Sequence, residues 1–289
     1  MDLCNPKEIK ALLGRHGFRF SKQMGQNFLI QEWVPRQTAE ASGAAPGVGV
    51  LEIGPGIGPL TQQLCLRAGK VCAVEVDTRL EPILRETVGE FQNLEILWGD
   101  VLKQDIPALV REKFSGLRPM ACANLPYYIT TPILSALLEA DCFDSVTVMV
   151  QKEVAQRIAA KPGTGDYGAF SVLCQYYSKA EYLFDVPASC FLPAPKVTSA
   201  VVRMTVQHPP ADIGDEAFFF QVVRAAFAQR RKTLLNSLSS ALGGWSKGEI
   251  LSAMDACGLP ADIRGERLGI PEFAALADAL RQSRDTVRP

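Results

Sequence analysis

The chain has 289 residues, of which 47% are hydrophobic and 21% charged, and its formal net charge at pH 7 is −1. This balance is typical of a folded globular protein with a sizeable core, and it argues against disorder outside the ends of the chain. The sequence contains no run of about 18 apolar residues and no apolar leader at the N-terminus, so we expect a cytoplasmic protein.

Strand-like and helical segments alternate through most of the chain. A first buried run leads through a glycine loop into a helix expected at 59–68. Such alternation implies right-handed crossovers and a mostly parallel sheet that is covered on both faces. The last run is rich in β-branched residues, and we expect it to pair antiparallel at an edge of the sheet. The seven expected strands are 48–53, 70–75, 94–97, 120–123, 145–150, 181–186 and 197–206.

The segment 208–214, H-P-P-A-D-I-G, is rich in turn-forming residues and closes the sheet-forming part. We therefore expect a domain boundary there, with an α/β domain at 1–208 and a small all-helical domain at 209–289. Apolar residues at helical spacing predict the helices of the second domain, at 216–242, 247–257 and 271–281.

A glycine loop, E-I-G-P-G-I-G at 52–58, lies where the first expected strand ends and a helix begins. Its spacing differs from the dinucleotide fingerprint, and Pro55 would occupy space that a pyrophosphate needs, which argues against nicotinamide and flavin cofactors. Glu75 and Asp100 follow the next two strands, where carboxylates can accept from ribose hydroxyls and an adenine amine. Together these strand ends predict a nucleoside site without a phosphate site. The alternative is a glycine turn that serves packing alone.

The sequence Asn124-Leu125-Pro126-Tyr127 follows the fourth expected strand and should face the same crevice. An adenine N6 amine is a poor nucleophile, because its lone pair is delocalised into the ring. The Asn124 side-chain oxygen and the Leu125 carbonyl can each accept one N6 hydrogen, while Pro126 holds Leu125 extended. Tyr127 can stack on a flipped-out base. This pattern predicts methylation of an amino group, and the alternative is a simple turn.

A direct displacement by N6 on a sulfonium methyl needs positioning and no strong base. The chain has only two histidines, and its eight cysteines never form a C-x-x-C pair, so neither imidazole chemistry nor a metal is expected. Phe191 lies in the proline-bounded segment F-L-P-A-P-K-V, and it either presents a second face to the target base or fills the core.

Two basic stretches bracket the near-neutral body of the chain. The first includes Lys22, and the second places Arg230, Arg231 and Lys232 in succession on an expected helix. Such cations suit contacts with phosphates, which position a nucleic acid without reading its sequence. The alternative is that both stretches are solvated faces.

Taken together, these motifs resemble the ribosomal RNA adenine dimethyltransferase family, most closely its bacterial small-subunit branch. The resemblance covers most of the chain and rests on 25–29 (G-Q-N-F-L), 52–58, 75–77 (E-V-D), 99–100, 124–132, 151–157, 191–202 and 230–238. It implies a Rossmann-like class I methyltransferase fold. It further implies that S-adenosylmethionine is bound by Asn27, Leu29, Gly54, Gly56, Glu75, Asp100, Val101 and Asn124.

The substrate that this resemblance implies is a pair of adjacent adenines in the 3′-terminal hairpin loop of 16S ribosomal RNA, each of which receives two methyl groups. Asn124 to Tyr127 and Phe191 would hold the adenine. We expect a monomer that binds the small ribosomal subunit or its precursor. Open alternatives are a large-subunit methyltransferase of the macrolide-resistance type, a non-catalytic assembly factor and a DNA adenine methyltransferase.

Overall fold

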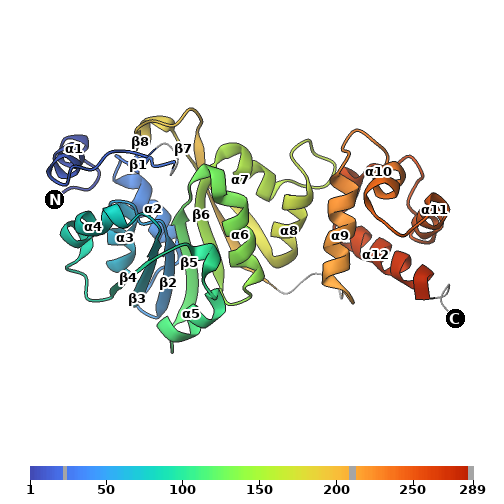
Figure 1. The fold of residues 1–289 in the computed structure, drawn as a ribbon, viewed down its shortest axis with the longest axis horizontal. Coiled ribbons are helices and arrows are strands. Elements are labelled where there is room, and N and C mark those ends of the chain that lie inside the picture. The colour runs from blue at the N-terminus through green and yellow to red at the C-terminus, as the bar shows by residue number, and fades with distance from the viewer. Residues whose placement is uncertain (22–24, 208–212, 286–289) are drawn as a thin grey trace. The chain divides into compact units, whose positions relative to one another are not determined.

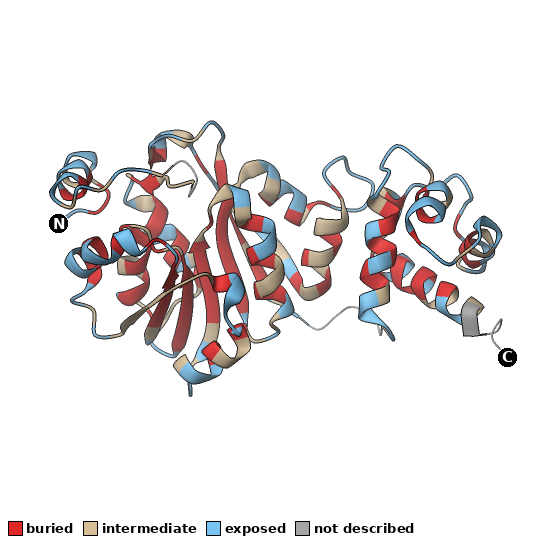
Figure 2. Ribbon diagram, viewed as in Figure 1, coloured by how far each residue is buried: buried red, intermediate tan, exposed pale blue. Residues whose placement is uncertain are grey.

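The computed structural model describes residues 1–21, 25–207 and 213–285. The chain divides into two compact units, one made of residues 1–155 and 179–206 and the other of residues 156–178 and 207–289. Each unit has its own set of elements (Figure 1) and its own buried core (Figure 2).

The first unit is built on a seven-stranded sheet in the described part of the chain, with the order β4-β3-β2-β5-β6-β9-β7. The strands from β4 to β6 run parallel, and β9 runs antiparallel to β6, which confirms a mostly parallel Rossmann-like sheet (Figure 1). The strands are β2 (Val48–Ile53), β3 (Lys70–Glu75), β4 (Leu94–Trp98), β5 (Arg118–Asn124), β6 (Ser145–Gln151), β7 (Ser178–Val186) and β9 (Ser199–Val206).

The expectation that the segment 197–206 lies at an edge of the sheet is wrong. The strand β9 does pair antiparallel with β6, but β7 lies beyond it and forms the edge. Consequently β9 is buried along most of its length, whereas β7 is exposed or half-buried at every residue between its two buried ends. A β-branched run is compatible with either position, because strand propensity reflects burial more than place in the sheet.

Helices connect the strands of the first unit, and two of those in the described ranges, α1 and α5, begin with a side-chain cap. The Asn5 side chain accepts from the Lys7 N–H to start α1, and Asp105 accepts from the Ala108 N–H to start α5. Helix α2 packs across β5, β6 and β9 and against α3. The helices are α1 (Pro6–Arg15), α2 (Trp33–Ser42), α3 (Pro59–Cys65), α4 (Glu81–Val88), α5 (Ile106–Lys113) and α6 (Thr130–Glu139), with 3-10 turns η1 (Thr78–Leu80), η2 (Val101–Lys103), η3 (Tyr127–Ile129) and η4 (Ala188–Cys190). Helix α7 (Lys152–Ala159) begins in the first unit and ends in the second.

A second, two-stranded sheet joins the N-terminal region to a distant loop. The strand β1 (Phe28–Leu29) pairs antiparallel with β8 (Phe191–Leu192), so that Leu29 lies opposite Phe191. The Ile30 N–H continues the pairing with a hydrogen bond of 2.8 Å to the Cys190 carbonyl. Segments at opposite ends of the first unit's sequence therefore meet.

The central strands are buried over almost their whole length. Every residue of β2 is buried, as are all residues of β6 except Gln151 (Figure 2). Continuous burial of this kind indicates a parallel sheet with both faces covered. Polar side chains that matter for function are consequently confined to the ends of these strands.

The second unit packs helices around an aromatic core. Tyr176 of α8 lies 5.3 Å from Phe219 and 5.0 Å from Phe220 of α9, measured between ring centroids. This packing draws residues 156–178 into the helical unit, so the division differs from the expected boundary after residue 208. Its helices are α8 (Ala169–Tyr177), α9 (Glu216–Phe227), α10 (Leu234–Ala241), α11 (Lys247–Ala256) and α12 (Ile270–Asp285), with the 3-10 turn η5 (Gly265–Arg267).

The expected single helix at 216–242 is wrong, because it is interrupted between α9 and α10. Residues 228–233 form a turn, and the Thr233 side chain caps the new helix by accepting from the Asn236 N–H. The three consecutive cations at 230–232 therefore lie on this turn and not on a helix. None of the helices within the described ranges combines the length and apolar character that crossing a bilayer requires.

Candidate functional site

The carboxyl ends of β2, β3, β4 and β5 surround a cavity of about 240 Å³ in the first unit. Ligands of open α/β sheets bind at this end of the strands. The structure places every expected cofactor residue and every expected adenine-holding residue on the wall of this one cavity. They are Asn27, Leu29, Gly54, Gly56, Glu75, Asp100, Val101, Asn124, Leu125, Pro126, Tyr127 and Phe191.

The glycine loop after β2 requires its glycines for two different reasons. Gly54, Gly56 and Gly58 have φ angles of 70°, 60° and 94°, which side-chain-bearing residues rarely adopt. A Cβ on Gly58 would also lie 2.8 Å from the Val88 Cγ1, and one on Gly56 would lie 3.3 Å from the Phe28 ring. The loop can thus pass closely beneath a ligand while packing against its neighbours.

Glu75 ends β3 and is only 5% exposed. Its Oε1 accepts from the Asp77 N–H at 2.8 Å, and its Oε2 accepts a longer bond of 3.4 Å from the Gly56 N–H. Burial raises the pKa of this carboxyl, and these backbone hydrogen bonds oppose the rise. Because each carboxylate oxygen has two acceptor sites, Glu75 keeps capacity for ligand hydroxyls.

Asp100 lies beyond β4 at the same rim of the cavity. Its Oδ1 accepts from the Leu102 N–H at 3.0 Å and so caps the turn η2, which fixes the direction of the side chain. Val101, the first residue of η2, is buried and contributes an apolar wall. This pairing of an acceptor with an apolar surface suits the edge and the face of a nucleobase.

The segment Asn124-Leu125-Pro126 leaves β5 with two acceptors available at the cavity. The Leu125 N–H donates to the Met149 carbonyl at 3.1 Å, which anchors the segment to β6. Neither the Leu125 carbonyl nor the Asn124 side chain makes a hydrogen bond with another described residue. Pro126 is extended, with φ −59° and ψ 132°, and its own carbonyl is occupied by Thr130 at 3.1 Å.

Tyr127 is half-buried, and its hydroxyl lies 2.6 Å from the Ser199 Oγ on β9. Burial raises the pKa of Tyr127, while the bond with Ser199 works against the rise. The neighbouring Tyr128 is 60% exposed and also borders the cavity. The bond between its hydroxyl and Ser199 therefore holds the Tyr127 ring in place.

Phe191 both fills the core and lies at the cavity, which are the two places that the sequence left open for it. It is 3% exposed and packs in a cluster that includes Leu29, Met149 and Val201, yet it also borders the cavity. Its place there results from the pairing of β1 with β8. The same pairing brings Asn27, whose side-chain amide donates to the Gly25 carbonyl at 2.9 Å, to the cavity wall.

Glu52 is a cavity residue that the sequence analysis did not single out. It is 1% exposed, and neither of its carboxylate oxygens has a hydrogen-bond partner among the described residues. Burial raises its pKa to about 8, while the neighbouring Thr61 hydroxyl opposes the rise and the nearby charge of Glu75 adds to it. The available signal in the sequence was an acid directly before the glycine loop. A buried carboxyl without a hydrogen-bond partner calls for an explanation, and a place beside a ligand cavity is one.

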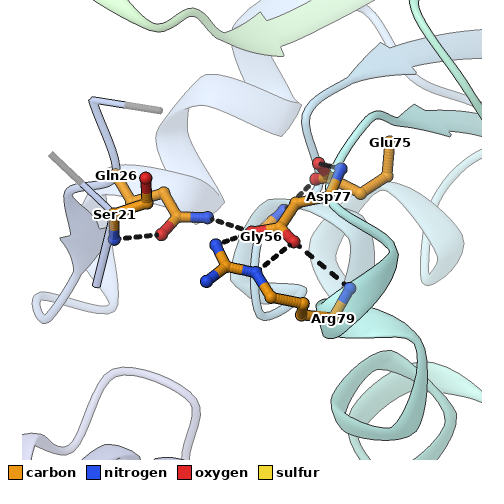
Figure 3. A network of polar contacts seen from close by, with 6 residues as sticks. All are labelled: Ser21, Gln26, Gly56, Glu75, Asp77 and Arg79. Atoms are coloured by element: carbon orange, nitrogen blue, oxygen red, sulfur yellow. Dashed lines mark hydrogen bonds and ion pairs between the residues drawn. The ribbon is translucent and has the colours of Figure 1, made fainter. Parts of the chain in front are cut away.

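Two further residues missed by the sequence analysis are Gln26 and Asp77, which join in a polar network beside the cavity (Figure 3). The charged side chains that border the cavity in the described residues are all acidic, namely Glu52, Glu75, Asp77 and Asp100. The raised pKa of Glu52 keeps it largely protonated near neutral pH, and Arg79 pairs with Asp77, so the negative charge comes mainly from Glu75 and Asp100. This charge favours a cationic ligand with hydroxyl and amine donors, and it disfavours phosphate. No group of three or more potential metal ligands occurs among the described residues.

The cations expected to contact RNA differ in their hydrogen bonding. Arg230 donates to the carbonyls of Gly165 and Tyr167, at 2.6 and 3.1 Å, and lies 3.7 Å from Glu266. The side chains of Arg231 and Lys232 are exposed and pair with no described residue. Lys22, the fourth expected contact, lies outside the described residues.

Comparisons with known proteins find relatives along nearly the whole chain. The family model for ribosomal RNA adenine dimethylase matches residues 17–255. A relative from Geobacillus thermodenitrificans, named Ribosomal RNA small subunit methyltransferase A, is 50% identical over 284 residues, covering 96% of this chain and 97% of its own. One of the same name from Bacillus licheniformis is 46% identical over 286 residues, covering 97% and 98%.

Two solved structures share the architecture. The crystal structure of the 23S rRNA methyltransferase ErmE is 27% identical with a TM-score of 0.65, and the match covers 89% of this chain and 100% of that one. A dimethyladenosine transferase from Plasmodium falciparum is 23% identical with a TM-score of 0.71, covering 89% and 98%. The second likeness supports the fold alone.

Proposed function

The chain belongs to the ribosomal RNA adenine dimethylase family, and we propose that it dimethylates the N6 amines of two adjacent adenines in the 3′-terminal hairpin loop of 16S ribosomal RNA. The main support is that two hydrogen-bond acceptors at the cavity, the Asn124 side chain and the Leu125 carbonyl, have no partner among the described residues, and that the ionisable residues of the cavity wall are all acidic. The near-complete matches to small-subunit methyltransferases support the choice of substrate.

S-adenosylmethionine fits the cavity by charge and by hydrogen bonding, and it would supply the methyl group. Glu75 and Asp100, the acids on the cavity wall that no cation of the described residues pairs with, suit a ligand that carries a sulfonium and an ammonium group. Glu75 would accept from the ribose hydroxyls, and Asp100 from the adenine amine. Gly54 and Gly56 would let the backbone approach the ligand, while Asn27, Leu29 and Val101 complete the wall.

The residues after β5 would prepare the target amine. Asn124 and Leu125 would each accept one N6 hydrogen, which holds the nitrogen in place and makes its lone pair more available. Tyr127, held by Ser199, and Phe191 would flank the flipped base, in an aromatic arrangement typical of such pockets. The proton lost from N6 would pass to an oxygen acceptor or to water.

The second unit would hold the ribosomal RNA through phosphate contacts, with Arg231 and Lys232 free to make them. We also propose that the enzyme acts as a monomer on the small subunit or its precursor. The substrate implies a location in the cytoplasm.

The large-subunit alternative finds less support, because ErmE is 27% identical to this chain whereas the small-subunit relatives reach 46–50%. The deciding experiment is incubation of the protein with labelled S-adenosylmethionine and undermethylated small or large ribosomal subunits, followed by mapping of the modified nucleotides. We expect two adjacent dimethylated adenines in 16S ribosomal RNA. Label in the large subunit alone, or none in either, would refute the proposal.

A further inference from the structure

Asp77 links three parts of the first unit, and the reaction described above gives it no role. It lies two residues beyond β3 and is 4% exposed. Its carboxylate accepts from the Arg79 side chain at 2.6 and 2.7 Å and from the Gln26 side-chain amide at 2.7 Å (Figure 3). A buried carboxylate with this many donors is fixed in one orientation.

We propose that Asp77 is a positioning residue, which fixes the N-terminal segment 25–29 and the Glu75 carboxylate in the one arrangement that binds S-adenosylmethionine. The proposal rests on the proposed function, because it takes S-adenosylmethionine as the occupant of the cavity. Asp77 itself need not touch the reacting atoms.

The link from Asp77 to Glu75 runs through the backbone. The Asp77 N–H donates to the Glu75 Oε1 at 2.8 Å, and the other oxygen of Glu75 faces the Gly56 N–H (Figure 3). Any rotation of the turn at Asp77 would move this donor and with it the carboxylate. Glu75 therefore depends for its direction on the bonds that hold Asp77.

The link from Asp77 to the N-terminal segment runs through Gln26. This side chain donates to Asp77 with its amide nitrogen and accepts from the Ser21 N–H with its oxygen, at 3.1 Å. Gln26 and its neighbour Asn27 both border the cavity. The single bond between Gln26 and Asp77 thus joins the strand β3 side of the cavity to its N-terminal wall.

An aromatic cluster supports the same connection. The Arg79 guanidinium lies 5.2 Å from the centre of the Phe18 ring, and Phe18 lies 6.1 Å from Phe28, measured between ring centroids. Phe28 in turn packs close to Gly56. Arg79 also pairs with Asp77 and offsets part of the negative charge that this acid places next to Glu75.

The test compares wild-type protein with Asp77→Asn, Gln26→Glu and the Gln26→Glu/Asp77→Asn double variant. Binding of S-adenosylhomocysteine is measured by calorimetry, and KM for S-adenosylmethionine and kcat are measured on undermethylated small subunits. Arg85→Met serves as the control, because it removes an exposed ion pair with Glu81 that does not border the cavity.

Asp77→Asn should raise Kd and KM about tenfold, the lower end for loss of a charge-assisted hydrogen bond, while kcat changes less than about twofold. Gln26→Glu places two carboxylates together and should weaken binding by a similar factor. The double variant restores an amide-to-carboxylate bond with donor and acceptor exchanged, so it should recover most of the lost affinity. Arg85→Met should bind as the wild type does.

The inference is overturned if Asp77→Asn binds normally, or if the double variant binds no better than Gln26→Glu alone. General destabilisation would lower kcat as well as affinity, whereas a positioning role raises Kd and KM with kcat nearly unchanged. Should Asp77→Asn fail to fold, the comparison of Gln26→Glu with the double variant still decides. If wild-type protein does not bind S-adenosylhomocysteine, the proposed function itself fails, and that outcome is distinct.

Discussion

The Tyr127 hydroxyl lies 2.6 Å from the Ser199 Oγ, so the loop after β5 is tied to the antiparallel strand β9. This bond orients the ring at the cavity without using its face. The ring and the hydroxyl thereby have separable roles, the first in stacking and the second in support.

Replacement of Tyr127 should separate these roles. Tyr127→Ala removes the stacking face and should lower kcat/KM for small subunits by roughly 10- to 100-fold, because base stacking contributes about 1–3 kcal/mol. Tyr127→Phe keeps the face and loses only the bond to Ser199, so it should stay within about threefold of wild type. Equal activities of the two variants in steady-state kinetics would contradict the stacking role.

Asn124 should act on turnover more than on binding. Asn124→Leu keeps the approximate size but removes the acceptor, and we expect kcat to fall by about 100-fold or more, as for loss of one catalytic hydrogen-bond partner. Asn124→Asp keeps an oxygen acceptor and should retain more activity than Asn124→Leu. Single-turnover rates and S-adenosylhomocysteine affinity distinguish the effects, and unchanged turnover in Asn124→Leu would remove the mechanism.

Glu75 should act on cofactor binding. Glu75→Ala removes the acceptor for the ribose hydroxyls, and KM for S-adenosylmethionine should rise by roughly 10- to 100-fold, since hydrogen bonds to charged groups contribute about 1.5–3 kcal/mol. Glu81→Gln, at an exposed acid of α4, is the matched control and should leave KM unchanged. A normal KM in Glu75→Ala would place the ribose elsewhere.

The three consecutive cations of the second unit should have different roles: Arg231 and Lys232 should bind RNA, and Arg230 should stabilise the fold. Arg231→Gln and Lys232→Gln should each weaken binding to small subunits and reduce the slope of log K against log salt by about 1, without changing Tm. Arg230→Gln should instead lower Tm, because it removes the hydrogen bonds that Arg230 donates to the carbonyls of Gly165 and Tyr167. Unchanged salt slopes for Arg231→Gln and Lys232→Gln would mean that this turn does not face RNA.

The buried Glu52 should make stability depend on pH. Its folded-state pKa of about 8 lies above the ordinary value of 4.5, so the unfolded chain releases this proton first as pH rises. Below about pH 4.5 the Glu52 carboxyl is protonated in both the folded and the unfolded chain, so it does not make stability depend on pH. Between pH 4.5 and 8 it ionises in the unfolded chain alone, and the free energy of unfolding therefore falls as pH rises. Glu52→Gln should be more stable than wild type by a margin that grows across this window in urea unfolding. A margin independent of pH would show that Glu52 is not desolvated.

Local patterns were enough to predict the sheet and the place of the site. Apolar runs separated by helical stretches determine a parallel sheet, and in such a sheet Glu75, Asp100 and Asn124 must arrive at the same end. The strand bounds 48–53 and 70–75 are the observed ones. The site was predictable because chain order and strand direction alone bring these three residues together.

Contacts between segments that are distant in the sequence were decided only by the tertiary structure. The pairing of Leu29 with Phe191, the bond between Gln26 and Asp77, and the bonds of Arg230 to residues 165 and 167 join segments that no local pattern relates. The aromatic packing of Tyr176 likewise moved residues 156–178 into the helical unit. Strand and helix periodicity reports which face of a segment is apolar, whereas the choice of partner depends on shape and burial across the whole fold.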